Sequence, residues 1–122
     1  MKIINPKNIA NDDVTRMPLF TGGKVETQDI YEAEITAQKL QVVNVKFAQG
    51  ARNKFHTHTR EQLLVITEGK GIVADRQREY TVTPGMIVVI PAGEEHWHGA
   101  APDSNFTHLS ILGVPQEMKI TA

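Results

Sequence analysis

From Gly22-Gly23 onward, the chain alternates between short stretches rich in Val, Ile, Thr, Phe and Tyr and breakers made of Gly, Pro, Asn and Asp. Stretches of this kind predict β-strands, because β-branched and aromatic side chains fit a pleated, half-buried surface. An apolar period of 3.6 residues is not sustained after residue 36, so helices are not expected there. The pattern predicts strands over residues 24–30, 39–48, 54–58, 62–68, 70–75, 78–82, 86–90, 95–98 and 106–113.

Two segments depart from this pattern. The first 22 residues mix polar side chains with Pro6 and Pro18, which predicts an irregular arm with a short turn of helix. Residues 31–38, YEAEITAQ, fit either a short helix or a polar edge strand. The many short strands, with no linker between them, predict one all-β domain of sandwich, jelly-roll or barrel type over residues 23–122, preceded by an arm over residues 1–22.

Composition narrows the function by exclusion. The chain has no cysteine, which excludes disulfides, thiolate metal sites and a cysteine nucleophile. Its 13 basic and 14 acidic residues form no basic patch, so we expect no nucleic-acid partner. The start of the chain lacks the pattern of a signal peptide, and the apolar run MIVVI (86–90) is far too short to cross a bilayer. We therefore expect a cytoplasmic protein with no membrane partner.

Two pairs of histidines carry the candidate chemistry. Successive side chains of a strand point to opposite faces, so His56 and His58 in FHTHT share one face. The same spacing recurs in HWH, at His96 and His98. Two imidazoles on one face can bind one metal ion, although short motifs of this kind also arise by chance on exposed strands.

The glycines and prolines around the histidines strengthen the metal interpretation. The first pair lies in G-x5-H-x-H-x3-Q-x6-G between Gly50 and Gly69, and the second cluster reads G-x5-P-x-G-x2-H between Gly85 and His96. Both clusters resemble the motifs of the cupin superfamily, whose members are jelly-roll β-barrels that bind a divalent metal through three histidines and usually one glutamate. The resemblance implies the metal ligands His56, His58, Gln62 and His96. It also implies one divalent ion, with Mn preferred and Fe, Ni, Co or Zn compatible with these ligand types.

The fourth ligand position holds an amide where the superfamily usually has a carboxylate. Glu61 does not replace it, because adjacent residues of a strand face opposite sides. A neutral Gln62 would leave the full charge on the metal, which favours a stronger Lewis acid and an anionic exchangeable ligand. The alternative is that Gln62 only lines the barrel.

His108 lies in the strand NFTHLSIL, where Phe106, His108 and Ser110 share a face. A lone histidine on a strand is often only a structural hydrogen-bonding group. The segment EEHWHGAAPDSNFTHLSIL, together with GARxxxHTH, resembles the bacterial cupin hydroxynitrile lyases, which are typically manganese-dependent and also carry glutamine at the fourth ligand position. In those lyases the catalytic histidine follows the last metal-binding histidine by twelve residues, which implies that His108 is a general base.

The resemblance also assigns the pocket walls. Val43 and Val45 would line the wall opposite His108, and Leu112 stands where the lyases have a glutamine, which predicts a drier substrate end. His98 is either a partner of the metal ligands, a pocket acid–base group or a histidine at the rim of the barrel.

Four functions remain open at this point. We expect a metal-dependent lyase that acts on a small carbonyl or cyanohydrin substrate. The alternatives are a metal-dependent dioxygenase, a keto-sugar or uronate isomerase, and a non-catalytic protein that binds a small molecule. Basic pocket residues would favour the isomerase. We also expect a homodimer in which the arm over residues 1–22 is exchanged with the partner.

Overall fold

A computed structural model of the chain describes residues 1–31 and 39–121. The segment 31–38, expected to be a short helix or an edge strand, lies outside the described residues except for Tyr31. Within the described part, strands dominate, the only helix is a short 3-10 turn, and no helix is long and apolar enough to span a membrane. The elements are η1 (Pro6–Asn8), β1 (Asp12–Asp13), β2 (Phe20–Thr21), β3 (Val25–Tyr31), β4 (Lys39–Phe47), β5 (Arg52–Asn53), β6 (His56–His58), β7 (Gln62–Gly69), β8 (Gly71–Ala74), β9 (Glu79–Val82), β10 (Ile87–Ile90), β11 (Trp97–Ala100), β12 (Phe106–Val114) and β13 (Met118–Ile120).

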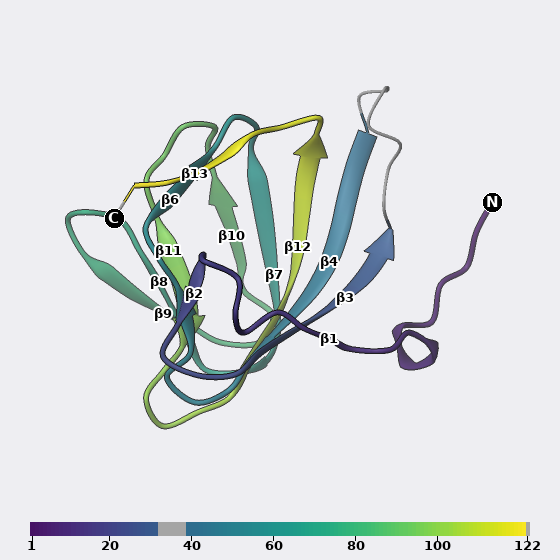
Figure 1. The fold of residues 1–122 in the computed structure, drawn as a ribbon, viewed down its shortest axis with the longest axis horizontal. Coiled ribbons are helices and arrows are strands. Elements are labelled where there is room, and N and C mark those ends of the chain that lie inside the picture. Colours follow the sequence, from purple (N-terminus) through teal and green to yellow (C-terminus); the bar gives the residue numbers. More distant parts are fainter. Residues whose placement is uncertain (32–38, 122) are drawn as a thin grey trace.

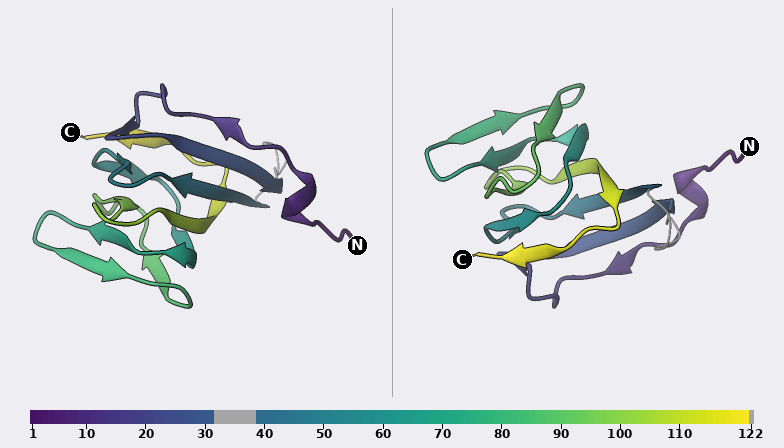
Figure 2. Two further views of the ribbon diagram at one scale, coloured as in Figure 1. Left: turned by 90° about the horizontal axis from the view of Figure 1, so that it is seen from below. Right: turned by 90° about the horizontal axis from the view of Figure 1, so that it is seen from above.

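The strands form two layers that face each other (Figures 1 and 2). Sheet A has six strands in the order β1-β3-β4-β12-β7-β10, and sheet B has five in the order β2-β5-β11-β8-β9. Strands β6 and β13 form a separate two-stranded sheet, and every pairing is antiparallel. The all-β jelly roll predicted from the sequence is therefore confirmed.

The alternation of side chains along sheet A separates its two faces. On β12, Phe106, His108 and Ser110 are buried, whereas Leu109 and Ile111 are only half-buried. The buried side chains face the core between the sheets, where Phe47 and Phe106 stack with their ring centroids 6.1 Å apart. The shared face predicted for Phe106, His108 and Ser110 is thus present.

Two predicted strands have different bounds near the histidines. The predicted stretch 54–58 is shorter in the structure, where β6 begins at His56, and the separate strand β5 precedes it. Between them the carbonyl oxygen of Lys54 accepts a hydrogen bond from the His56 ring at 2.7 Å. The stretch 95–98 is shifted, so that β11 begins at Trp97 and His96 precedes it. His96 is nevertheless fixed, since its backbone pairs with that of His56 as an isolated bridge.

The arm over residues 1–22 is more regular than its composition predicts. It contains the expected helical turn, η1, and also β1 and β2, which pair with β3 and β5 of the same chain. The Gln28 side chain donates to the carbonyl oxygens of Pro6 and Ile9, at 2.8 and 2.7 Å, and accepts from Asn44 at 2.9 Å. These bonds hold the arm on its own domain, while residues before η1 extend away from it (Figure 2).

Candidate metal centre

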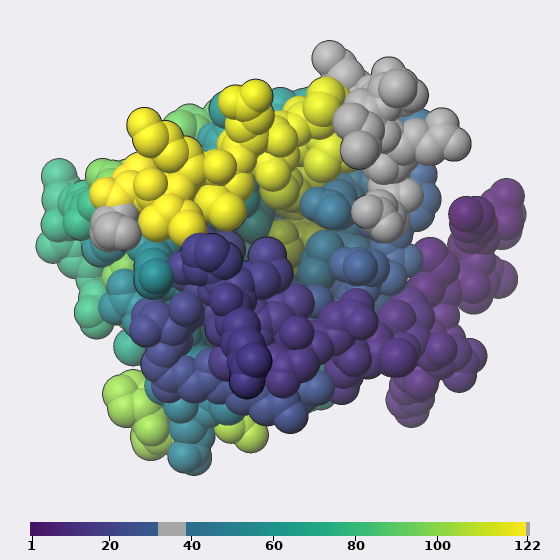
Figure 3. All heavy atoms as spheres, viewed as in Figure 1, coloured from purple at the N-terminus to yellow at the C-terminus, as the bar shows by residue number. Residues whose placement is uncertain are grey.

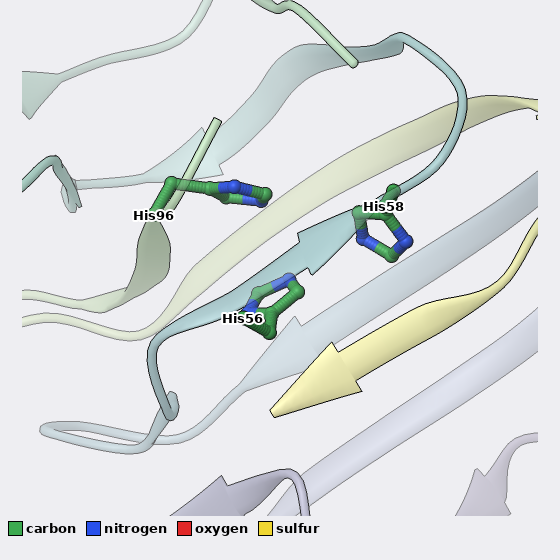
Figure 4. Close-up of side chains that lie close together, drawn as sticks. All are labelled: His56, His58 and His96. Atoms are coloured by element: carbon green, nitrogen blue, oxygen red, sulfur yellow. The ribbon is translucent and has the colours of Figure 1, made fainter. Parts of the chain in front are cut away.

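Three histidines converge where β6 meets the start of β11. His56 and His58 point to one side of β6, as their spacing predicts, and His96 faces them from across the isolated bridge (Figure 4). One nitrogen of each ring lies within 4.8 Å of a nitrogen of the other two. All three side chains are at least nine-tenths shielded from solvent. The structure therefore brings together the three histidines that the sequence assigned to a metal.

Each of these rings is oriented by an oxygen atom at Nδ1. His56 Nδ1 is 2.7 Å from the Lys54 carbonyl oxygen, and His96 Nδ1 is 2.8 Å from that of Glu94. His58 Nδ1 is 3.0 Å from the side-chain oxygen of Gln116. Because these oxygens only accept, each Nδ1 carries the proton and each Nε2 keeps its lone pair. His96 Nε2 is buried without a hydrogen-bond partner.

Burial keeps the three imidazoles neutral. It is the main cause that lowers the pKa of His56 to about 3, and the neighbouring His96 lowers it further. Burial also lowers the pKa of His58 and of His96. A neutral imidazole with a free lone pair is the form that binds a metal ion, so the donor set fits a divalent cation.

Gln62 resembles the three histidines in that one polar atom of its side chain is hydrogen-bonded within the protein and the other is not. Its Nε2 donates to Ser110 Oγ at 2.8 Å, which fixes the orientation of the amide. Its Oε1 is buried and has no hydrogen-bond partner. An amide oxygen without a partner costs free energy in a dry site unless a cation or a ligand group reaches it. The role of Gln62 as a fourth ligand remains a prediction that this chemistry fits.

A second group of hydrogen-bonded side chains lies deeper in the barrel. His108 is fully buried, and its Nε2 is 3.0 Å from Nδ1 of His98. Asn53 Oδ1 accepts the backbone N–H of His98 at 2.8 Å, so its amide nitrogen faces the His98 ring, 3.2 Å from Nε2. Burial lowers the pKa of His108 to about 4 and that of His98 well below its usual value. Both rings are therefore neutral near pH 7, and His98 lies inside the barrel rather than at its rim.

One cavity of about 420 Å³ connects the two groups. Val43, Val45 and Leu112 line it together with His108 and Gln62, as the sequence predicts. A volume of this size suits a small organic ligand. No lysine or arginine is among the lining residues that the structure describes, and the charged ones are two acids, Asp12 and Asp29.

The arm closes one side of this cavity, which its sequence did not indicate. Val14, Met17, Leu19 and Phe20 of the arm line the cavity opposite Gln116 and Met118 of the C-terminal segment. In the space-filling view these two segments, purple and yellow, lie against each other over the body of the molecule (Figure 3). The arm is therefore part of the site.

Sequence reasoning also missed Asn53 and Gln116, the residues that orient His98 and His58. Asparagine and glutamine carry no sequence signal for such a role unless the pairing of the strands is known. Ser110 could have been found, because it shares a strand face with His108.

Comparisons with known proteins agree with this geometry. Residues 43–112 match the Cupin domain family. Over 72 residues the chain is 44% identical to an (R)-mandelonitrile lyase of Granulicella tundricola, covering 56% of this chain and 53% of that protein. It is 24% identical over 99 residues to an acireductone dioxygenase of Cronobacter sakazakii, covering 72% of this chain and 55% of that protein. The chain thus spans about half the length of the curated relatives it matches.

A solved structure extends the likeness to almost the whole fold. The crystal structure of a cupin-like protein from Thermotoga maritima superposes with a TM-score of 0.79 at 30% sequence identity, covering 99% of this chain and 90% of that one.

Proposed function

Because this chain belongs to the cupin domain family, we propose that it is a metal-dependent lyase that acts on a small, neutral cyanohydrin or carbonyl compound. The observation that supports the proposal best is the buried His98–His108 pair in a cavity that His56 and His58 also line. These two histidines and His96 form a cluster able to hold a metal. The 44% identity to a protein named (R)-mandelonitrile lyase favours this reaction class.

The metal would be held by His56, His58 and His96, with the Gln62 amide oxygen as fourth ligand. When bound, a divalent ion supplies Lewis acidity at a substrate oxygen, and manganese is our first choice among the compatible ions.

His108 would move the substrate proton. A single proton lies between His108 Nε2 and His98 Nδ1, and His108 Nδ1 is buried without a hydrogen-bond partner. The Asn53 amide nitrogen faces His98 Nε2, which assigns the shared proton to His98 Nδ1 and leaves the proton of a neutral His108 on Nδ1. His108 would accept the hydroxyl proton of a cyanohydrin at Nδ1, as the C–C bond to cyanide breaks, from the other tautomer, in which its own proton is on Nε2 and the Asn53 amide nitrogen no longer donates to the His98 ring. Asn53 and His98 would keep the His108 ring in place. This step requires a neutral His108, which its lowered pKa provides near pH 7.

The charges around the cavity support a neutral substrate. Asp12 and Asp29 are the charged lining residues, and both would repel a carboxylate. Val43, Val45 and Leu112 offer apolar contacts to a small hydrocarbon group. These features weigh against a uronate isomerase, which would need basic side chains to bind its substrate.

The test compares the rates at which the metal-loaded protein and its His108→Ala variant cleave mandelonitrile. The metal content of both proteins is measured first. We expect benzaldehyde release by the parent protein and a rate about 10²- to 10⁴-fold lower in the variant, because the variant lacks the base. Glu79→Gln, on exposed β9, serves as the control and should keep the parent rate. Equal rates for parent and His108→Ala would exclude His108 as the base.

Metal-dependent dioxygenation is the second candidate, favoured by the similarity to a protein named acireductone dioxygenase. Oxygen consumption measured during turnover separates the two reactions. A lyase gives the same product yield with and without oxygen, whereas a dioxygenase stops when oxygen is removed.

A further inference from the structure

The cavity of the candidate site has a buried end and an open end. At the buried end His108 is fully buried, and Val45 keeps only 8% of its surface exposed. At the open end Met17 of the arm keeps 49% exposed and Met118 of β13 keeps 38%. We call Met17 and Met118 the methionine rim. The segments that carry these two residues lie against each other over the body of the molecule (Figure 3).

The backbone of the arm is fixed on both sides of Met17. The backbone N–H of Val14 donates to the carbonyl oxygen of Val25 at 3.0 Å. On the other side, the carbonyl oxygen of Leu19 accepts the backbone N–H of Lys54 at 2.8 Å. The Met17 N–H itself donates to the Val14 carbonyl oxygen at 3.0 Å. The side chain of Met17 is therefore presented to the cavity from a backbone that is held in place.

The other apolar side chains of the arm at this cavity belong to the packed interior. The ring of Phe20 lies edge-on to that of Phe47, with the centroids 6.2 Å apart, and Phe20 and Val14 both pack against the hydrophobic core. The two methionines are more exposed and lie outside that core cluster. A methionine side chain is unbranched and has three rotatable bonds, so it adapts to the shape of a neighbouring group. The methionine rim is thus the adjustable part of an otherwise packed wall.

We propose that the methionine rim determines the size of the substrate that the site accepts. This inference rests on the proposed function, in which the substrate is a small neutral cyanohydrin or carbonyl compound. When the oxygen of such a molecule lies at the buried histidines, its hydrocarbon group passes Val43 and Leu112 and points to the open end. A longer hydrocarbon group meets the two methionines first, so Met17 and Met118 set the limit.

The test compares the binding of two alcohols that differ in size and that the protein cannot cleave. Benzyl alcohol has one ring and 2-naphthylmethanol has two fused rings, and nuclear magnetic resonance titration of protein loaded with diamagnetic Zn²⁺ gives both dissociation constants. Met17→Ala should shift the ratio of the two constants about tenfold in favour of 2-naphthylmethanol, because the open end gains space. Met17→Trp should shift the ratio in the opposite direction, because the larger side chain fills that space.

Met86→Ala is the matched control. Met86 keeps 48% of its surface exposed, close to the value for Met17, but it precedes β10 and lines a different groove. Its replacement should leave the ratio of the two dissociation constants as in the parent. An unchanged ratio in both Met17 variants, or an equal shift in Met86→Ala, would overturn the proposal. Failure of the parent to bind either alcohol would overturn it as well.

These binding measurements are independent of turnover, so they separate the inference from the proposed function. If the parent binds benzyl alcohol but does not cleave mandelonitrile, the proposed reaction is wrong. The binding ratios of the Met17 variants still decide in that case whether the methionine rim sets the size of the ligand.

Discussion

At the scale of single residues, the site is defined by which polar atoms the protein binds and which it leaves free. The three histidines are held at Nδ1 by oxygen acceptors, and Gln62 is held at Nε2 by Ser110. His96 Nε2 and Gln62 Oε1 are buried without a hydrogen-bond partner. Buried polar atoms are rarely left in this state unless a ligand uses them.

The replacement Gln62→Glu tests whether this position contacts the metal. A carboxylate would add a negative charge beside the cation, and Ser110 Oγ could still donate to it. We expect divalent metal to bind at least about tenfold more tightly. Calorimetric titration of metal-free protein with Mn²⁺ measures the change. Unchanged affinity in both Gln62→Glu and Gln62→Met would show that residue 62 lies outside the ligand set.

At the scale of secondary-structure elements, the short strand β5 positions His98, because Asn53 of β5 accepts the backbone N–H of His98. Gly99 of β11 is paired with Arg52 of β5. A Cβ on Gly99 would overlap Arg52 and come within 2.5 Å of the Ala51 carbonyl oxygen. Glycine is therefore required for the close approach of these strands, and the Asn53–His98 hydrogen bonds depend on that approach.

Gly99→Ala should separate β5 from β11. We expect a loss of about 1–3 kcal/mol in the free energy of unfolding, since an extra methyl group is forced against the backbone of β5. Urea denaturation followed by circular dichroism measures it. Thr81→Ala, on exposed β9, is the comparison and should stay within about 0.5 kcal/mol of the parent. Equal stability of Gly99→Ala and the parent would contradict the crowding at this pair.

The longer strands could be predicted from the sequence because their side chains alternate between core and outside. The predicted strands 39–48, 62–68 and 106–113 correspond to β4, β7 and β12 with bounds that differ by one residue at most. Four strands of two or three residues, β1, β2, β5 and β13, were not predicted, because they are too short to show a period. Such short strands form only through backbone hydrogen bonds to a partner strand that is distant in the sequence.

The candidate site also contains residues that could be predicted from the sequence and residues that could not. His56, His58 and His96 were predicted as a group because the glycines and prolines around them match the cupin motifs, and the structure brings them together. The base role of His108 came only from the resemblance to the hydroxynitrile lyases and remains a prediction. Asn53, Gln116 and the cavity wall formed by Met17 and Phe20 could not be predicted, since their roles depend on contacts between segments far apart in the sequence.

At the scale of the whole molecule, all five histidines lie in one buried region, which couples folding to pH. Burial lowers the pKa of each, to about 3 for His56 and about 4 for His108. In the unfolded chain their pKa returns to about 6.5. Below that pH the unfolded chain binds protons that the folded chain does not, so acid favours unfolding.

We therefore expect metal-free protein to lose stability steadily as the pH falls from about 6.5 to 4. Each histidine that stays neutral in the folded state contributes up to about 1.4 kcal/mol per pH unit over this range. Urea denaturation at pH 7, 6 and 5 measures the slope. A free energy of unfolding that does not change between pH 7 and 5 would show that the histidines are not held neutral by burial.

During synthesis on the ribosome, β6 is made well before β13, the strand with which it pairs. Met118 is opposite His58, so the strand bearing two of the histidines meets its neighbour only after some 60 further residues have been added. At translation rates of about 5–20 residues per second, that interval lasts about 3–12 s. Until then β6 has only the bridge between His56 and His96. The ring of His58, which Gln116 orients, therefore reaches its final position only after the C-terminal segment has emerged from the exit tunnel.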